Sequence, residues 1–177
     1  MLRFFPFLAA LFLLSKQVQA ACYEEAAQRY AVSESLLRAI AKVESGNRDA
    51  KTVENVNANG TRDIGRMQIN TGWLPTLKQY GIGEKELRDE CTSIHVGAWI
   101  ISQNISAKGL SWDAVGAYNV GCKGLTKDDC QARRNRYAWR VFRLLKPHEQ
   151  KKPEPSPQVA AVVERKRSIG SVEFHDQ

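Results

Sequence analysis

The sequence predicts a mainly α domain of the α+β class, in which helices are joined to one small β-hairpin and two disulfides close the chain. Three observations predict it. Apolar residues recur at helical spacing in several segments, a polar stretch carries an Asn-Gly turn, and four cysteines follow an export signal. The part of the chain that carries these patterns is long enough to form a core of its own.

The export signal occupies residues 1–20. A positive charge at Arg3 is followed by an apolar run, Phe4–Leu14, and by small residues at Val18 and Ala20. The apolar run is too short to cross a bilayer core of about 30 Å. We therefore predict cleavage after Ala20, a mature chain without a membrane span, and an oxidising compartment for the mature protein.

Composition changes sharply at Pro147. Four of the six prolines lie in residues 147–177, where charges mix with no long apolar period. This composition predicts a disordered tail, and residues 21–146 are then a single domain. Within the tail, the stretch QVAAVVERKRS at Gln158–Ser168 combines a short apolar patch with basic residues, which suits ordering on a partner surface.

The first predicted helix begins after Ser33, a candidate cap, and ends at Gly46. Its apolar positions at helical spacing are Leu36, Leu37, Ile40 and Val43. The same reasoning predicts helices at Pro75–Tyr80, Ile94–Asn104, Ala114–Asn119 and Arg136–Leu145. The polar stretch NVNANGTRD at residues 55–63 predicts the hairpin, because Asn-Gly favours a tight turn between two strands.

The four cysteines are expected to form two disulfides, for which three pairings exist in principle. Cys122 and Cys130 flank one short polar segment, so we predict that they pair and close this loop. Cys22 would then join the start of the domain to Cys91. The three histidines are scattered singly, so no ligand spacing for zinc is present and no metal is expected.

The formal net charge of +7 falls to +5 when the signal, with Arg3 and Lys16, is removed. Part of this excess is a run of arginines whose charge could suit an anionic partner: Arg133, Arg134, Arg136, Arg140 and Arg143. We interpret the run as the solvated face of a helix. Aromatic and basic residues do not interleave as in a nucleic-acid-binding module, so no nucleic acid is expected.

Glu44 is the first candidate for chemistry. It follows Leu37 by seven residues and Ile40 by four, so it shares the apolar face of its helix near the C-terminal end. Burial and the negative end of the helix dipole both favour the protonated form and raise the pKa of the carboxyl. On this segment alone, an exposed glutamate paired with Lys42 or Arg48 explains the pattern equally well.

Three motifs decide between these alternatives: ESG at Glu44–Gly46, NANGTRDIGRMQIN at Asn57–Asn70, and AYNVG at Ala117–Gly121. In this order and spacing, after an export signal, the sequence resembles the lytic transglycosylases, lysozyme-like enzymes that cut the glycan strands of bacterial cell wall. The resemblance extends from Cys22 to about Leu145. It is strongest to the small exported members that accompany type III and type IV secretion, conjugation and pilus systems. It implies a lysozyme-like fold with the hairpin region lining a glycan cleft.

The resemblance implies that Glu44 is the catalytic acid and base and that Ser45 orients the carboxyl or the sugar. Gly65 would let the backbone approach a sugar ring, and Met67 and Gln68 would line the cleft. The other residues expected to bind substrate are Asn70, Tyr118 and Asn119. In the third motif the tyrosine hydroxyl is expected to face the reacting sugar.

Arg66 departs from the family, which most often has leucine at this position. Its side chain either points outward or brings a cation toward the anionic muramic acid or stem peptide. The tryptophans are better explained as core or groove wall: Trp73, Trp99, Trp112 and Trp139.

The expected reaction cleaves the β-1,4 bond between N-acetylmuramic acid and N-acetylglucosamine without water, and it needs no cofactor. Glu44 would protonate the leaving oxygen and then accept the proton of the sugar's own C6 hydroxyl, which closes a 1,6-anhydro ring. In a first alternative the enzyme is a lysozyme-type muramidase that uses water, with Asp63 as a second carboxylate. In a second alternative the domain is a non-catalytic wall-binding assembly subunit. The expected location is the periplasm, and the expected partners are peptidoglycan and, through the tail, a secretion, conjugation or pilus assembly.

Overall fold

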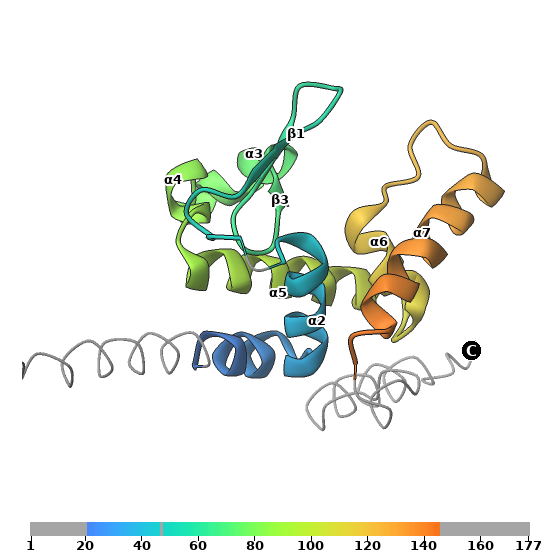
Figure 1. Ribbon diagram of the computed structural model, residues 1–177, viewed down its shortest axis with the longest axis horizontal. Helices are drawn as coiled ribbons and strands as arrows, with labels where there is room; N and C mark the ends of the chain where they lie inside the picture. The colour runs from blue at the N-terminus through green and yellow to red at the C-terminus, as the bar shows by residue number, and fades with distance from the viewer. Residues whose placement is uncertain (1–20, 47, 146–177) are drawn as a thin grey trace, which may run out of the picture.

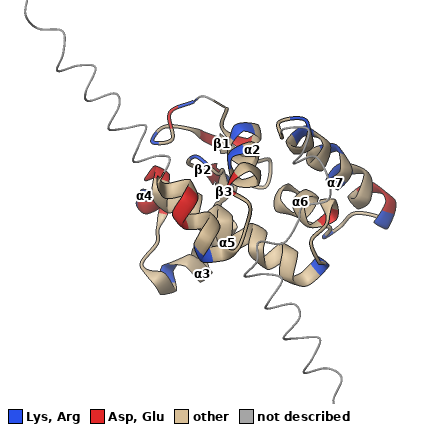
Figure 2. Ribbon diagram, turned by 90° about the horizontal axis from the view of Figure 1, so that it is seen from below, with Lys and Arg blue, Asp and Glu red and all other residues tan. Residues whose placement is uncertain are grey.

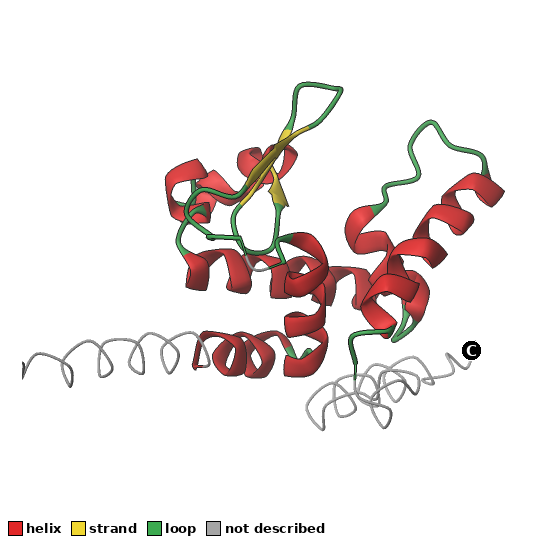
Figure 3. Cartoon of the chain, viewed as in Figure 1, coloured by secondary structure: helices red, strands yellow, loops and turns green. Residues whose placement is uncertain are grey.

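The computed structural model describes residues 21–46 and 48–145 (Figure 1). The predicted signal peptide, residues 1–20, and the predicted tail, residues 147–177, lie outside the described residues. The described part is mostly helical with one small sheet (Figure 3), as the sequence predicts.

The described residues begin with a helix over residues 21–30. The α-helices that follow are α2 (Glu34–Glu44), α3 (Leu74–Leu77), α4 (Glu84–Leu87), α5 (Glu90–Lys108), α6 (Trp112–Asn119) and α7 (Lys127–Phe142). Two short 3-10 helices, η1 (Thr71–Trp73) and η2 (Lys78–Tyr80), flank α3. The strands are β1 (Glu54–Val56), β2 (Arg62–Ile64) and β3 (Ile69–Asn70).

Helix α2 begins and ends where the sequence predicts. The Ser33 side chain accepts a hydrogen bond from the backbone N–H of Leu36, which satisfies one of the free donors at the helix start. The buried face of α2 consists of Leu36, Leu37, Ala39, Ile40 and Ala41. Past the end, Gly46 has φ +63°, a left-handed conformation that glycine adopts without a steric cost. Local capping and burial therefore hold the two ends of this helix.

The other helices differ from the prediction mainly in length. α5 extends the predicted Ile94–Asn104 at both ends, and it starts earlier because the side chain of Asp89 caps it by accepting from the backbone N–H of Thr92. α7 starts at Lys127, well before the predicted Arg136, and Thr126 is its cap. Its first turns are polar, so an apolar period does not reveal them. The helix over 21–30 and α4 are short and have no such period either.

The sheet has three antiparallel strands in the order β1-β2-β3. The predicted hairpin is present, with Asn55 opposite Asp63 and Val56 opposite Arg62. β3 adds a third strand that pairs Asn70 with Asp63. Only two residues long, β3 is too short for a period to be visible in the sequence.

Helix α5 is the centre of the fold. In Figure 1 the sheet with α3 and α4 lies above α5 and the helix over 21–30 lies below it, while α2 runs upward from the end of that helix across α5. The α5 residues Ile94, Ala98 and Ile101 are fully buried in the same core cluster as Leu37 and Ile40 of α2. α6 and α7 pack together beside the far part of α5 (Figure 1). One core therefore connects the end of α2 with the sheet and with α7.

Both predicted disulfides are present: Cys22 pairs with Cys91 and Cys122 with Cys130. The first joins the helix over 21–30 to the start of α5 across 69 residues of sequence. On the loop-entropy model a closure of that length stabilises the folded chain by about 4 kcal/mol, and the short one by about 2.5 kcal/mol. The short bridge ties the loop after α6 to the first turn of α7.

The arginine run lies on α7, where Figure 2 shows basic residues along the helix. Arg133, Arg136, Arg140 and Arg143 are exposed, in agreement with a solvated face. Arg134 differs, because its side chain is largely buried and bonds the carboxylate of Asp113 on α6 at 3.1 Å. Within residues 21–46 and 48–145, no helix is long and apolar enough to cross a membrane, and no group of metal-ligating side chains is present.

Candidate active site

A cleft of about 720 Å³ lies between the sheet, α5 and α6, with the end of α2 at one side. Glu44, Gln68, Ile69, Tyr118 and Asn119 line it. The hairpin supplies most of its polar wall, through Asn57, Asn59, Thr61, Asp63 and Asn70. The cleft thus offers many neutral hydrogen-bonding groups and two carboxylates, a lining that suits a chain of hydroxyl and amide groups.

Glu44 is the last residue of α2, and its carboxyl is largely buried in the cleft. The hydroxyl of Tyr137, on α7, donates a hydrogen bond to Oε1 of Glu44 at 2.5 Å. Burial is the largest influence and raises the pKa of Glu44 from 4.5 to about 7, with a smaller upward contribution from the charge of Asp63. The Tyr137 hydrogen bond and the charges of Arg140 and Arg48 act in the opposite direction. The carboxyl therefore keeps its proton close to neutral pH, as a general acid must.

Tyr137 contacts the carboxyl of Glu44, although the sequence did not predict it as a site residue. It is 2% exposed, and its ring stacks near that of Tyr118, with 6.4 Å between the centroids. The guanidinium of Arg140 covers the same ring at 5.2 Å. Burial, with the charge of Glu44 beside it, raises the pKa of Tyr137 well above its ordinary value, so the hydroxyl stays a donor. A tyrosine that only packs in the core and one that contacts a catalytic acid occupy the same apolar positions of a helix, so the helical period does not distinguish them.

The raised pKa predicts how activity depends on pH. The protonated carboxyl is the competent acid, so the rate should fall as the pH rises through about 7 and Glu44 loses its proton. Initial rates of turbidity loss of purified cell walls, measured between pH 5 and pH 9 at constant ionic strength, provide the measurement. A rate that continues to increase up to pH 9 would exclude Glu44 as a protonated acid.

Ser45 does not face the cleft. It is 1% exposed, its hydroxyl donates to the carbonyl oxygen of Ala41 at 3.1 Å, and it accepts from Nη1 of Arg66 at 3.1 Å. Arg66 likewise matches neither predicted orientation, because its side chain turns inward and pairs with Glu90 at 2.6 Å. Both residues support the end of α2 and are not among those that line the cleft.

Gly65 and Met67 are also placed beneath the cleft rather than on its wall. Gly65 has φ +79°, and a Cβ there would lie 2.2 Å from the carbonyl oxygen of Leu87. The close approach that requires glycine is thus to the protein's own backbone, not to a sugar. Met67 is 0% exposed and packs on Gly97, where an added Cβ would meet its side chain at 2.6 Å.

Gln68 lines the cleft, but its amide is used within the protein. Its Nε2 donates to the carbonyl oxygens of Gly65 at 2.9 Å and Val53 at 3.4 Å, and its Oε1 accepts from Asn55. Its backbone has φ +49°, a conformation that is uncommon for residues other than glycine. The Gln68 side chain therefore holds the turn between β2 and β3 in place, and this turn supports the cleft wall.

Asp63 and Asn70 face each other across β2 and β3. Asn70 donates to Oδ1 of Asp63 at 2.7 Å, and Asn57 donates to Oδ2 at 3.0 Å. Asn70 also caps η1 by accepting from the backbone N–H of Gly72 at 2.9 Å. Asp63 therefore has a donor on each oxygen, and these bonds brace the hairpin against β3.

Tyr118 and Asn119 end α6 at the cleft wall. The Tyr118 hydroxyl donates to the carbonyl oxygen of Met67 at 2.9 Å, so its proton is directed at the protein backbone and not at the expected sugar. Burial raises the pKa of Tyr118 well above its ordinary value, so the group remains a neutral phenol. Its oxygen keeps acceptor capacity toward a substrate hydroxyl.

Three of the four tryptophans lie in the core or in a groove wall, as the sequence predicts, and Trp139 does not. Trp73 lines the cleft and packs edge to face against Trp99, with 5.3 Å between ring centroids. Trp112 packs on Phe142 in the same way at 5.4 Å. Trp139 is 58% exposed and only stacks on Phe142, so it belongs to the surface.

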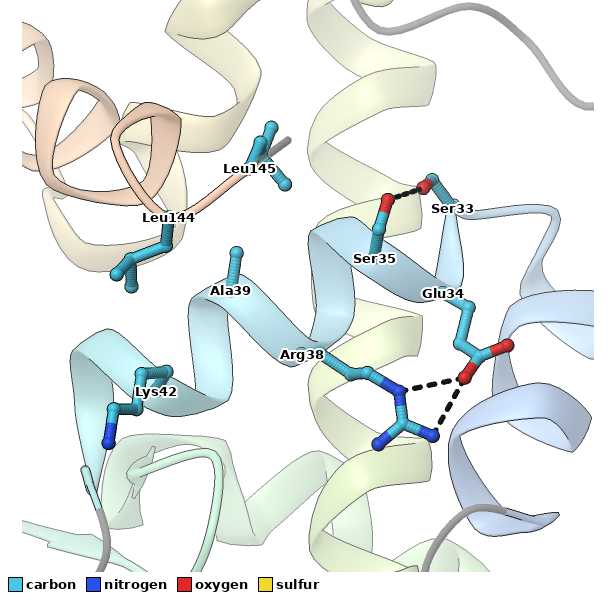
Figure 4. A pocket seen from close by; sticks show the side chains of 8 residues that line it. All are labelled: Ser33, Glu34, Ser35, Arg38, Ala39, Lys42, Leu144 and Leu145. Carbon is cyan, nitrogen blue, oxygen red and sulfur yellow. Dashed lines mark hydrogen bonds and ion pairs between the residues drawn. The ribbon is translucent and has the colours of Figure 1, made fainter. Parts of the chain in front are cut away.

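A second hollow lies between α2 and the residues after α7 (Figure 4). Its lining consists of Ser33, Glu34, Ser35, Arg38, Ala39, Lys42, Leu144 and Leu145. Glu34 and Arg38 are paired with each other at 2.7 Å, and no lining residue is shared with the cleft of Glu44. The one carboxylate in this lining is that of Glu34, which is already paired with Arg38, so the cleft of Glu44 is the candidate active site.

Comparison with known proteins assigns the family. Residues 21–140 match the family described as the Transglycosylase SLT domain. The chain is 37% identical over 142 residues to the invasion protein IagB of Salmonella typhi, covering 79% of this chain and 87% of that protein. It is 38% identical over 126 residues to protein IpgF of Shigella flexneri, covering 71% of this chain and 79% of that protein.

Among solved structures, the chain resembles an inactive mutant of the lytic transglycosylase Slt from Pseudomonas aeruginosa, with a TM-score of 0.56 and 22% identity. The match covers 76% of this chain but only 25% of that larger one, and it supports the fold alone. The lysozyme-like fold expected from the motifs is confirmed. With two thirds of its length inside the family match and relatives above 30% identity, the chain belongs to the lytic transglycosylases of the SLT domain family.

Proposed function

We propose that the protein cleaves the β-1,4 bond between N-acetylmuramic acid and N-acetylglucosamine and leaves a 1,6-anhydro-muramic acid end. The observation that carries the proposal is one buried carboxyl, Glu44, which keeps its proton near neutral pH in a cleft lined by amides and hydroxyls. Glycosidic cleavage needs an acid of this kind at the leaving oxygen.

In the first step, protonated Glu44 gives its proton to the glycosidic oxygen while the bond from that oxygen to C1 breaks. Tyr137 donates to Oε1, so the proton of the carboxyl is held on the other oxygen, toward the cleft. Positive charge develops at C1 and the ring oxygen of the muramic acid. Departure of the chain then leaves Glu44 as a carboxylate beside this centre.

In the second step, the C6 hydroxyl of the same sugar attacks C1 and loses its proton to Glu44. The new C1–O6 bond closes the anhydro ring, and Glu44 returns to its protonated state, so atoms and charge balance. An intramolecular hydroxyl has a very high effective concentration, which lowers the barrier by several kcal/mol relative to a free water. One carboxyl with a pKa near the working pH can serve in both directions.

The hydrogen bonds of Asp63 agree with a reaction that uses Glu44 alone. A base that activates water, or a nucleophile, must direct a carboxylate oxygen at the reacting centre. The oxygens of Asp63 accept from Asn70 and Asn57, and this supports a bracing role that also adds negative charge near the developing cation. The muramidase alternative remains as an outcome of the product analysis.

Mass spectrometry of digested peptidoglycan tests the proposal. Muropeptides released by the enzyme should carry anhydro ends, whose mass is lower by one water than that of reducing ends. A commercial muramidase digest of the same wall provides the control for reducing ends. If the enzyme releases reducing muramic acid, the water-using alternative with Glu44 and Asp63 replaces the proposal.

We further propose that residues 1–20 export the chain to the periplasm and that it opens the wall locally for a secretion, conjugation or pilus assembly. The names of the relatives, with an invasion protein among them, support a role in such a system. Residues 147–177 would tether the enzyme to that assembly through Gln158–Ser168, after the domain at 21–146.

Truncation at Pro147 tests the tether. The purified truncated enzyme should cleave walls at the rate of the full chain, because the cleft and its supports lie within residues 21–145. In the source cell, the same truncation should reduce secretion, conjugation or pilus assembly. A loss of wall cleavage in vitro, or an unchanged assembly function in the cell, would contradict the proposal.

A further inference from the structure

The end of α2 carries Glu44, so its backbone must be held in place for catalysis. Glu44 is the last residue of the helix, at a terminus where backbone carbonyls have no partner inside the helix and the last turn tends to fray. An acid that must meet one glycosidic oxygen cannot move by as much as 1 Å without a loss of rate. The residues that immobilise this terminus therefore matter to the reaction.

Two arginines bind the backbone at this terminus. Arg48 does so locally, because its Nη2 donates to the carbonyl oxygen of Glu44 at 3.0 Å and its Nε to that of Ser45 at 3.1 Å. Its side chain is exposed, and it follows Glu44 by only four residues. Beyond this segment its Nη1 donates to Oδ1 of Asn55 on β1, but that bond is long, 3.4 Å, and open to water, so Arg48 ties the terminus to the sheet weakly.

Arg66 reaches the same terminus from the segment between β2 and β3. Its Nη1 lies within hydrogen-bonding distance of Ser45 Oγ at 3.1 Å, the Gly46 carbonyl oxygen at 3.4 Å and the Arg48 carbonyl oxygen at 3.2 Å. Its Nε donates to Glu90 on α5 at 2.6 Å. The Arg66 side chain is 13% exposed, so these bonds are shielded from competing water.

The base of the Arg66 side chain is itself rigid. Gly65 before it contacts the Leu87 backbone too closely for any Cβ, and the backbone N–H of Met67 after it donates to the buried hydroxyl of Ser93 at 3.0 Å. The carboxylate partner, Glu90, precedes Cys91, whose disulfide to Cys22 fixes the start of α5. Arg66 thus connects the end of α2 to the most constrained part of the core.

We propose that Arg66 is a positioning residue, which holds the carboxyl of Glu44 in its buried place by clamping the backbone of residues 45–48 to Glu90. The inference rests on the proposed function for its catalytic meaning, but the clamp itself can be measured without any reaction. A planar guanidinium can bind the carboxylate through one nitrogen and the backbone through another, whereas the ammonium of lysine is a single point of charge.

The test compares Arg66→Leu, Arg66→Lys and a matched control, Arg88→Leu. Arg88 also joins a carboxylate, that of Glu54, to a backbone carbonyl, that of Lys51, but it has no contact with α2. For Arg66→Leu we expect kcat to fall about tenfold with little change in KM, because the acid is misplaced while the sugar-binding wall stays intact. Arg66→Lys should restore less than half of the loss, and the Arg88 variant should retain the wild-type kcat.

The second readout is the pKa of Glu44 itself, obtained by carbon-13 NMR titration of labelled glutamate carboxyls and assigned with Glu44→Gln. A carboxyl that leaves its buried place regains water, so its pKa should fall in Arg66→Leu, and the alkaline limit of activity should move to lower pH. A loss of packing alone would lower the melting temperature and leave this pKa unchanged.

An unchanged kcat and an unchanged Glu44 pKa in Arg66→Leu, measured well below its melting temperature, would overturn the inference. If the leucine variant does not fold, Arg66→Lys and Glu90→Gln carry the same two readouts. The pKa measurement also separates the two proposals: it reports the clamp even if the wild-type enzyme proves to release reducing ends.

Discussion

Replacing Glu44 with glutamine is expected to reduce the rate of wall cleavage about a thousandfold or more. Glutamine has nearly the same shape and can still accept the hydrogen bond of Tyr137, but it has no proton to give to the leaving oxygen and no base to take one back. Rates are measured on purified walls, with a zymogram as a second assay. Glu24→Gln, an exposed change outside the cleft, is the control and should retain the full rate.

The same variant has a predicted effect on stability. The pKa of Glu44 is higher in the folded state than its ordinary 4.5, so the folded state binds the proton more tightly and loses stability as the pH rises from 4.5 through about 7. At 1.36 kcal/mol per unit, deprotonation costs the native state about 3 kcal/mol. Glu44→Gln should therefore exceed the wild type in stability at pH 8, by an amount of that order, and match it more closely at pH 4.

Full activity in Glu44→Gln would remove the catalytic role of this residue. It would favour another residue as the catalytic acid, or the non-catalytic assembly subunit. The stability measurement shows whether an inactive variant is folded. A stable, inactive variant supports the mechanism, whereas a stable, active one contradicts it.

Tyr137→Phe is expected to lower the rate about a hundredfold and to move the alkaline limit of activity upward. In the wild type the hydroxyl lowers the pKa of Glu44 by donating to its Oε1, against the upward effect of burial. Without the hydroxyl, the pKa of Glu44 should rise further. The rate falls because the carboxyl loses the partner that sets which oxygen carries the proton. Full pH profiles of both enzymes on the same wall preparation give the two effects separately.

Tyr80→Phe is the matched control for the loss of one tyrosine hydroxyl, since Tyr80 is 72% exposed and is not part of the cleft lining. It should leave both the rate and the pH profile unchanged. An alkaline limit that moves downward in Tyr137→Phe, or stays in place, would show that the hydroxyl does not stabilise the carboxylate.

The sequence predicted best the features that local physics determines. Helix α2 has its cap, its apolar face and its terminal glycine within fourteen residues, from Ser33 to Gly46, so its ends were predicted correctly. The Asn-Gly turn in the hairpin is equally local. The pairing of Cys122 with Cys130 follows from short separation, and the pairing of Cys22 with Cys91 follows by exclusion.

The direction of a side chain was harder to predict, because it depends on contacts between distant segments. Tyr137 and Glu44 are separated by 93 residues, and nothing in the period of α7 distinguishes a tyrosine that packs from one that donates to an acid. Arg66 was assigned either to solvent or to the substrate, yet it binds groups 18 to 24 residues away in the sequence. An unusual residue inside a family motif was the signal, and its partner could not be inferred from one sequence.

The placement of Gly65 and Met67 shows the same limit at short range. Both stand in a motif that implies contact with sugar, but their surroundings are Leu87, Ser93 and Gly97. A motif can persist because it shapes the wall of a site and not because each of its members touches the ligand. For this chain, Gln68, Asn70 and Tyr118 line the cleft, while Gly65 and Met67 support them from below.

The edge-to-face contact of Trp73 with Trp99 has an optical consequence. Trp73 stands in the cleft wall, whereas Trp99 lines a separate hollow with Tyr30 and His95. A glycan strand that settles in the cleft displaces water from the first indole and leaves the exposed Trp139 untouched. The unlabelled protein thus contains its own fluorescent reporter of occupancy, and Trp112 and Trp139, which do not line the cleft, add a constant background to the emission of the paired indoles.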